Sequence, residues 1–151
     1  RADFKNLEQI FLSQNIQLDL SAAKLNTRQF YTDTQKFSSV LSKILSEMKK
    51  RDEFPDIKVS TTELKDRSIE IQITQIGSYS NKTAQSMLKE VDDGDFADIK
   101  ENLTNLCDWS IESSYEDESF RVNFLHSNNV KEIERLESKP KGFTHILRFY
   151  K

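Results

Sequence analysis

The chain has 151 residues, a formal net charge of -3 and 31% charged residues, which suits one globular domain with a strongly polar surface. The slightly acidic balance does not favour a nucleic-acid partner, and the absence of a long apolar run predicts no membrane segment. A single cysteine, Cys107, excludes an internal disulfide and fits a reducing compartment. Since no signal peptide is recognisable either, we expect a cytoplasmic domain.

The first 20 residues predict a helix followed by a strand. Phe4, Leu7 and Ile10 recur at helical spacing, which indicates a leading or linker helix over residues 1–14. Ile16 and Leu18 then alternate with polar residues, as expected of a half-buried strand that opens the main domain, residues 15–125. The leading helix either packs within the domain or faces a second copy and forms a homodimer.

A second helix is predicted after Asp33, which is a candidate cap. Its apolar residues share one face at helical spacing, and they are Phe37, Val40, Leu41, Ile44, Leu45 and Met48. Lys49, Lys50 and Arg51 end the helix, and Pro55 prevents its continuation. These three cations either are solvated and complement the helix dipole, or contact a phosphate or an acidic partner.

Two hairpins and two helical segments follow. Apolar alternation over 57–61 and 69–73 predicts an antiparallel hairpin that ends at Gly77, and the polar stretch after it holds a short helical turn around 84–90. A helix capped by Gly94 or Asp95 is predicted next, with Phe96 and Cys107 among its inward residues. Alternation over 109–113 and 119–125 predicts a second hairpin.

Residues 126–151 read as a helix-strand extension packed on the same domain. The spacing of Val130, Ile133 and Leu136 predicts a short helix. The apolar stretch 143–150 then predicts an edge strand, which either completes the sheet or pairs with another chain, the second possible route to a homodimer.

Isolated reactive residues favour structural interpretations. Cys107 lies on an apolar helical face and is expected to be buried and inert. His126 and His145 lack a partner acid or nucleophile nearby in the sequence, which favours surface or strand-end positions. The acidic run at 92–95 does not have the ligand spacing of a calcium loop, and an acidic helix entry explains it better.

The order strand, helix, hairpin, long polar connection, helix, hairpin resembles the histidine-kinase-type ATP-binding domain (GHKL class), which gyrase, the ninety-kilodalton heat-shock chaperones and MutL share. The resemblance implies an α+β fold, a two-layer α/β sandwich whose mixed, mostly antiparallel sheet is covered by helices on one face. The apolar register from Phe37 to Met48 matches the helix that carries two magnesium-binding asparagines in that family.

The family's nucleotide ligands fall on altered residues in this chain. The two asparagine positions align with Lys43 and Glu47, of which only Glu47 offers oxygen ligands for magnesium. The aspartate that binds the adenine amino group aligns with Gln75, two residues before the glycine that is kept, Gly77. The glycine-rich phosphate loop aligns with Gly94 and the two residues after it.

The resemblance implies a domain whose nucleotide site is degraded. Carboxylates far outnumber cations between Glu90 and Glu118, which would repel a triphosphate. We therefore expect a non-catalytic regulatory or protein-interaction domain of a larger signalling or assembly protein, a pseudoenzyme with no cofactor, whose partner is another protein or other domains of the same chain.

Two alternatives stay open. In one, the domain is a divergent but active ATP-binding domain that uses Glu47 for magnesium and Gln75 for adenine. In the other, it is an unrelated α+β structural scaffold.

Overall fold

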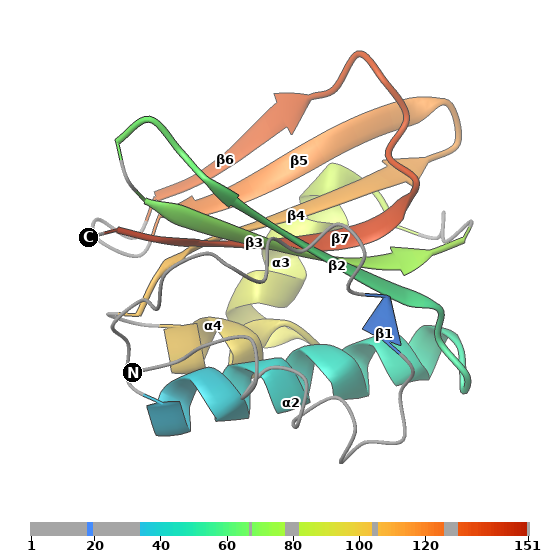
Figure 1. The fold of residues 1–151 in the computed structure, drawn as a ribbon. Coiled ribbons are helices and arrows are strands. Elements are labelled where there is room, and N and C mark those ends of the chain that lie inside the picture. The colour runs from blue at the N-terminus through green and yellow to red at the C-terminus, as the bar shows by residue number, and fades with distance from the viewer. Residues whose placement is uncertain are drawn as a thin grey trace.

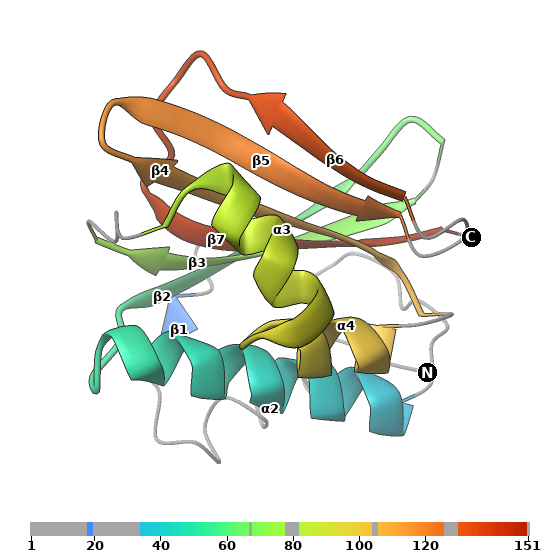
Figure 2. The same cartoon turned by 180° about the vertical axis from the view of Figure 1, so that it is seen from behind.

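The computed structural model describes residues 18–19, 34–66, 68–77, 82–103, 106–125 and 130–150. In this part of the chain, a sheet forms one layer and the helices form the other, all on one face of the sheet (Figures 1 and 2). The elements in chain order are β1 (Leu18–Asp19), α2 (Thr34–Arg51), β2 (Ile57–Glu63), β3 (Ile69–Ile76), α3 (Ala84–Asp93), α4 (Ala97–Leu103), β4 (Asp108–Tyr115), β5 (Glu118–Leu125), β6 (Val130–Arg135) and β7 (Gly142–Phe149). Among these helices none is long and apolar enough to cross a membrane.

The seven strands lie in the order β1-β2-β3-β7-β4-β5-β6. β1 pairs with β2 in parallel, and every other neighbouring pair is antiparallel. The mixed, mostly antiparallel sheet with helices on one face confirms the two-layer α+β fold class. The predicted leading helix at 1–14 and the cap at Asp33 lie outside the described residues, and only two residues of the predicted strand at 15–20 lie within them.

Helix α2 is the longest of the described helices and lies at one side of the helical layer, with α4 between it and α3 (Figure 2). Its predicted apolar stripe is buried throughout, because the stripe faces the sheet while the opposite side of the helix meets solvent. Lys49, Lys50 and Arg51 fill its last turn, as the sequence predicts. The helix packs against α4, which lies beside it in the same layer (Figure 2).

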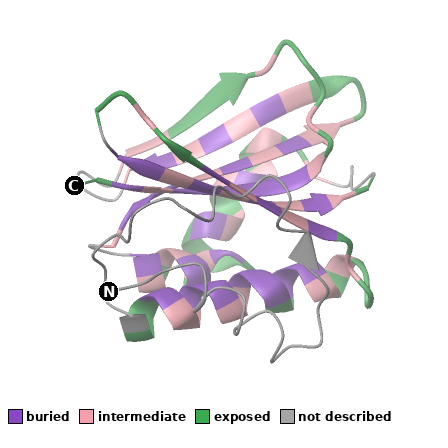
Figure 3. Cartoon of the chain, in the orientation of Figure 1, coloured by how far each residue is buried: buried purple, intermediate pink, exposed green. Residues whose placement is uncertain are grey.

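Both predicted hairpins are present. β2 pairs with β3, and β4 pairs with β5 across a turn at Glu116 and Asp117, where Glu116 adopts a positive φ of 54°. Side chains facing the helices are buried and those on the open face are less so, which produces the banding visible in Figure 3. The alternation that predicted these strands therefore reports which face of the sheet each residue occupies.

The C-terminal region differs from its prediction in both parts. Residues predicted as a helix around Val130 and Ile133 form strand β6, which pairs with β5 and makes the outer edge of the sheet. Residues predicted as an edge strand form β7, which lies inside the sheet between β3 and β4. The region 126–151 is thus not a helix-strand extension, because its two described strands are part of the main sheet.

The segment between the hairpins forms two helices joined by a short connection. α3 is longer than the single helical turn predicted there, and Thr83 caps it by accepting a hydrogen bond from the Ser86 N–H. Only residues 94–96 separate α3 from α4, and Phe96 is fully buried. The connection is therefore anchored to the core by an aromatic side chain.

Candidate functional site

The candidate site lies where the C-terminal half of α2 faces β3 and β7. Glu47 is buried on α2, and Gln75 is buried on β3 with no exposed surface. The structure thus brings together the two residues that align with the magnesium and adenine ligands of the resembling family. A third residue, Arg51, links them and was not predicted as part of the site.

Arg51 binds both predicted ligand residues at once. Its Nη2 donates to Glu47 Oε2 over 2.6 Å, its Nη1 donates to Glu47 Oε1, and its Nε donates to Gln75 Oε1 over 2.9 Å. Both members of the ion pair are largely buried, with 14% of the Arg51 and 6% of the Glu47 side chain exposed. Both Glu47 carboxylate oxygens and the Gln75 carbonyl therefore already accept bonds from the chain itself.

The other end of the Gln75 amide is also engaged. Its Nε2 donates to the carbonyl oxygen of Met48 over 2.8 Å. The Met48 carbonyl also accepts from the Asp52 N–H over 3.2 Å, so the bond from Gln75 is a second one that ties β3 to the last turn of α2. Gln75 consequently acts as a link between the two layers of the fold.

His145 on β7 completes the polar network. Trp109 Nε1 donates to His145 Nδ1 over 3.0 Å, and His145 Nε2 lies 3.4 Å from Glu47 Oε2. Because the indole is only a donor, Nδ1 carries no proton, and the neutral ring places its proton on Nε2, toward Glu47. The predicted surface or strand-end position of His145 is wrong, since the residue lies in the middle of β7 and has no exposed area.

Burial decides the protonation state of His145. Desolvation lowers the pKa of the imidazole well below its ordinary value, and the nearby positive charge of Arg51 lowers the pKa further. The ring is therefore neutral at physiological pH. One ion pair, Glu47 with Arg51, then carries the charge of the network.

Aromatic rings close the site around Arg51. The guanidinium carbon lies 3.7 Å from the centre of the Phe143 ring, a cation–π contact. Phe96 stacks on Phe143 with ring centres 6.0 Å apart, and it meets Trp109 edge to face at 6.1 Å. The segment aligned with the phosphate loop thus directs a phenyl ring into the core.

The two predicted glycines have local structural roles. At Gly94 an added Cβ would lie 2.8 Å from Glu90 Cα, and the Gly94 N–H donates to the Glu90 carbonyl over 3.1 Å, which closes the end of α3. Gly77 follows β3 with a φ of 144°, a conformation that favours glycine. Lys43 lies half-buried one turn before Glu47 and bonds to neither Glu47 nor Gln75.

Several carboxylates of the acidic segment have cationic partners from elsewhere in the chain. Asp92 accepts from Lys100 over 3.0 Å and also binds Lys131. Glu90 accepts from Lys82 over 2.9 Å. These pairs reduce the repulsion that the sequence predicted for a triphosphate. The bonds of Arg51 to Glu47 and Gln75 therefore oppose nucleotide binding more than the acidic segment does.

The residues present do not fit a magnesium nucleotide. Both oxygens of Glu47, the one predicted metal ligand, are bonded to Arg51. Among the described residues, no group of three or more histidine, cysteine or acidic side chains is placed to hold a metal ion. Cys107 is buried as predicted, but it lies directly before β4 and not on a helical face. Burial raises the pKa of its thiol far above its usual range.

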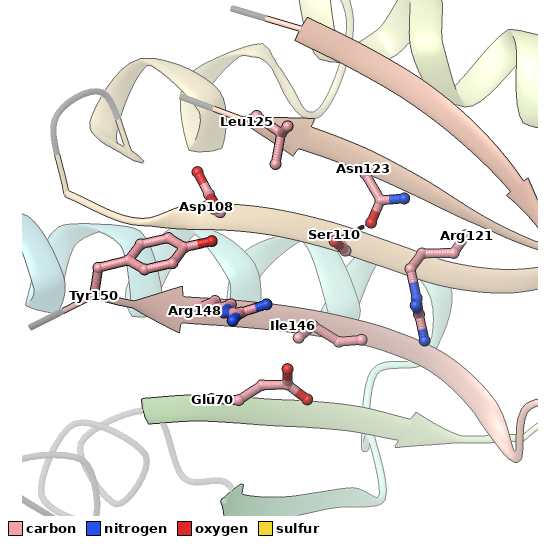
Figure 4. Close-up of a pocket in the computed structure, with 9 residues that line it drawn as sticks. All are labelled: Glu70, Asp108, Ser110, Arg121, Asn123, Leu125, Ile146, Arg148 and Tyr150. Atoms are coloured by element: carbon pink, nitrogen blue, oxygen red, sulfur yellow. Dashed lines mark hydrogen bonds between the residues drawn. The ribbon is translucent and has the colours of Figure 1, made fainter. Parts of the chain in front are cut away.

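A separate hollow of about 150 Å³ lies on the open face of the sheet, away from this site (Figure 4). Arg148 and Arg121 line it, and each is already paired: Arg148 with Asp66 at 2.7 Å and Arg121 with Glu112 at 2.8 Å. Ser110 donates to Asn123 across its wall over 2.6 Å. Carboxylates of the chain itself therefore already bind both arginines of the hollow.

Sequence reasoning missed Arg51 and His145, and only one of them left a signal. Glu47 and Arg51 are four residues apart on a helix, the spacing of a stabilising ion pair. That spacing does not reveal burial, which depends on β3 and β7. His145 could not be placed, because its neighbours come from α2 and β4 and no local pattern joins these elements.

Comparison with known proteins gives a family match over nearly the whole chain. A family model described as a histidine kinase domain observed in conflict contexts matches residues 4–150. No curated protein matches the sequence.

Three solved structures resemble the fold. The 43K ATPase domain of gyrase B from Thermus thermophilus, in complex with an aminocoumarin, gives a TM-score of 0.47 at 12% identity over 76% of this chain and 34% of that one. The ATP-binding domain of topoisomerase IV from Francisella tularensis, in complex with a small-molecule inhibitor, gives 0.41 at 14% identity over 77% and 60%. The N-terminal domain of a DNA repair protein gives 0.42 at 10% identity over 73% and 36%. The matches thus span 34% to 60% of the lengths of those chains.

Proposed function

The chain belongs to the family of histidine kinase domains observed in conflict contexts, and from this premise we propose that it is a non-catalytic member of that family. It acts as a regulatory or protein-interaction domain within a larger protein and uses no nucleotide. The observation that carries this proposal is the position of Arg51, which binds the residues aligned with both nucleotide ligands. Membership in the family also sets aside the alternative of an unrelated scaffold.

A nucleotide could enter the aligned position only if Arg51 left it. If Arg51 left, its hydrogen bonds to Glu47 and Gln75 would break. Each of these bonds contributes roughly 1–3 kcal/mol, because its partner is charged or buried. Its departure would also remove the cation–π contact with Phe143. Glu47 would then remain buried without its cation, which costs more than the lost bonds alone.

The phosphate end supports the same proposal. A phosphate loop needs exposed backbone N–H groups that approach the ligand closely. Here the Gly94 and Phe96 N–H groups both donate to the Glu90 carbonyl, over 3.1 and 3.2 Å. The Glu90 and Asp95 carboxylates flank this connection and meet Lys82 at 2.9 and 3.9 Å. The segment is therefore built to close α3 and not to receive an anion.

One observation favours the alternative of a divergent ATP-binding domain: Glu47 and Gln75 converge from separate elements, as ligands of one nucleotide would. In that case Glu47 would bind magnesium, and Glu47→Ala would abolish nucleotide binding. The non-catalytic proposal expects Glu47→Ala to change stability alone.

Thermal unfolding with millimolar Mg-ATP tests the proposal. A ligand that binds the folded state stabilises it, by about 2.7 kcal/mol when present at one hundred times its Kd. We expect an unchanged Tm relative to magnesium alone. A rise of several degrees with ATP, lost in Glu47→Ala, would contradict the proposal and support the ATP-binding alternative.

A further inference from the structure

The exposed edge of the sheet is β6. Within the described part of the chain it pairs with β5 alone, and the opposite edge, β1, has two described residues. The last four residues of β6 are exposed, and Ile133, an apolar residue, is 42% exposed. A strand in this position offers backbone groups to which another strand can add.

The hydrogen-bond register identifies the backbone groups that face outward. Leu136 N–H donates to the Ser119 carbonyl over 2.9 Å. In an antiparallel pair, bonded and non-bonded positions alternate, so Glu134 and Glu132 also bond to β5. Lys131, Ile133 and Arg135 therefore direct their N–H and C=O groups away from the sheet.

The side chains of β6 form a charge pattern that is symmetric about Ile133. Lys131, Ile133 and Arg135 share the helix-facing side with their β5 partners, Phe124, Val122 and Phe120. Glu132 and Glu134 lie on the open face, where Glu134 meets Arg121 at 3.4 Å. Residues 131–135 thus read basic, acidic, apolar, acidic, basic.

This pattern disfavours pairing with a second copy of the chain. A two-fold antiparallel pairing places one residue opposite its own copy, and between 131 and 135 only Ile133 is uncharged. Centring on Ile133 brings Lys131 opposite Arg135 and Glu132 opposite Glu134. Like charges directly opposite each other destabilise a strand pair, so β6 is unsuited to a homodimer through this edge. The strand predicted for that role, β7, is internal.

We propose that β6 binds an extended segment of a different protein with the complementary pattern: acidic, basic, apolar, basic, acidic. Centred on Ile133, such a segment places basic residues opposite Glu132 and Glu134 and acidic residues opposite Lys131 and Arg135. Because the pattern of β6 is symmetric, the complement holds for parallel and antiparallel approach alike. The central apolar residue covers Ile133.

The existing ion pairs of β6 leave it able to bind. Lys131 meets Asp92, Arg135 meets Glu118 at 2.7 Å, and Glu134 meets Arg121. All three are surface pairs, which contribute little to stability. Charges on a sheet edge also prevent aggregation, and the same residues that exclude a second copy select the complementary strand.

The β6 proposal rests on the proposed function, because it names the surface through which the domain would bind a protein partner. The two proposals can nevertheless be refuted independently. Nucleotide binding is tested at Glu47 by melting with Mg-ATP, whereas partner binding is tested at β6 with a peptide. Stabilisation by Mg-ATP would refute the absence of nucleotide binding without bearing on peptide binding at β6.

The test uses the full chain, isotope-labelled, with a synthetic peptide reading Thr-Glu-Lys-Val-Lys-Glu-Thr. We expect the peptide to slow hydrogen exchange at the amides of Lys131, Ile133 and Arg135, with binding that weakens as salt rises. The matched control is the charge-swapped peptide Thr-Lys-Glu-Val-Glu-Lys-Thr, which we expect not to bind. Equal protection by the two peptides, or none at millimolar concentration, would overturn the proposal.

Two variants check the register. Ile133→Pro removes an outward N–H and leaves the bonds to β5 in place, so it should fold and lose the peptide. The double variant Glu132→Lys with Glu134→Lys should bind the first peptide about tenfold more weakly and gain affinity for the charge-swapped one. Unchanged affinity in the double variant would contradict the role of the charge pattern. Concentration-dependent dimers that Ile133→Pro abolishes would show a second copy bound through β6 and would contradict the exclusion of a homodimer.

Discussion

At the scale of single residues, Arg51 decides the chemistry of the site. In the sequence it is one of three cations at the end of a helix, and solvation explains all three equally well. In the structure Lys50 is exposed, with 65% of its side chain accessible, while Arg51 turns inward to Glu47. The difference arises because Arg51 lies four residues after Glu47, on the side of α2 that β3 and β7 cover.

Removal of Arg51 should destabilise the fold strongly. Arg51→Met leaves Glu47 buried without its cation, a change that costs about 3–5 kcal/mol. Urea unfolding at neutral pH measures the loss. Lys50→Met is the matched control on the next residue, and we expect a change within about 0.5 kcal/mol. Adding Glu47→Leu to Arg51→Met should recover much of the loss, and failure to recover it would show that the buried charge is not the cause.

His145 should make stability depend on pH between neutrality and mild acid. Its pKa in the folded state is lowered well below 6.5, so the unfolded chain binds a proton there before the folded chain does. Stability is therefore complete above pH 6.5 and falls as the pH drops toward the depressed pKa, by up to about 1.4 kcal/mol per pH unit.

Unfolding curves at pH 7 and pH 5, followed by fluorescence of the single tryptophan, Trp109, measure this loss. His145→Gln should show a shallower pH dependence by one proton. The carboxyls of Asp66 and Asp92 also have lowered pKa values, but they titrate below this window. Equal slopes in the two proteins would contradict a neutral buried His145.

At the scale of elements, local periodicity predicted helix α2 and the two hairpins correctly. It did not predict β6 or the internal position of β7, because both depend on the order of strands in the sheet. The stripe of α2 and the alternation of both hairpins are local signals, and each element is present. Val130, Ile133 and Leu136 have helical spacing, yet they form or follow a strand because β5 offers an edge there. The apolar density of β7 reflects two flanking strands, β3 and β4, which lie far away in the sequence.

The connection between α3 and α4 should depend on its aromatic anchor. Phe96 is fully buried against Phe143 and Trp109, so Phe96→Ala leaves a cavity and should cost about 3–5 kcal/mol. Phe54→Ala is the matched control, because Phe54 is 83% exposed, and it should change stability by less than about 0.5 kcal/mol. Thermal unfolding of both variants measures the difference, and similar effects would contradict the anchoring role.

At the scale of the whole molecule, the histidine-kinase-type fold is present, and Arg51 binds the two residues that align with nucleotide ligands. Glu47 on α2, Gln75 on β3 and His145 on β7 form one network with Arg51, and this network joins the helical layer to the sheet. The sequence alone indicated that the aligned ligands were altered. It did not indicate that Arg51 binds both aligned residues, since this contact depends on how α2, β3 and β7 are placed relative to one another.

The same scale separates the two proposed roles in space. The filled site lies between the layers, whereas β6 lies at the outer edge of the sheet (Figure 1). A partner strand at β6 would extend the sheet without entering the helix–sheet interface. The proposed absence of nucleotide binding and the proposed binding edge are therefore compatible in one domain.

The most direct measurement of the central claim is a nitrogen–proton NMR spectrum of the Arg51 Nε–H and the Trp109 indole N–H, recorded with and without millimolar Mg-ATP. The account predicts that both resonances are protected from solvent exchange and do not move, because Arg51 already occupies the site and nothing displaces it. A saturable shift of the Arg51 resonance, with loss of its protection as ATP is added, would show that a nucleotide replaces Arg51 and would contradict the account.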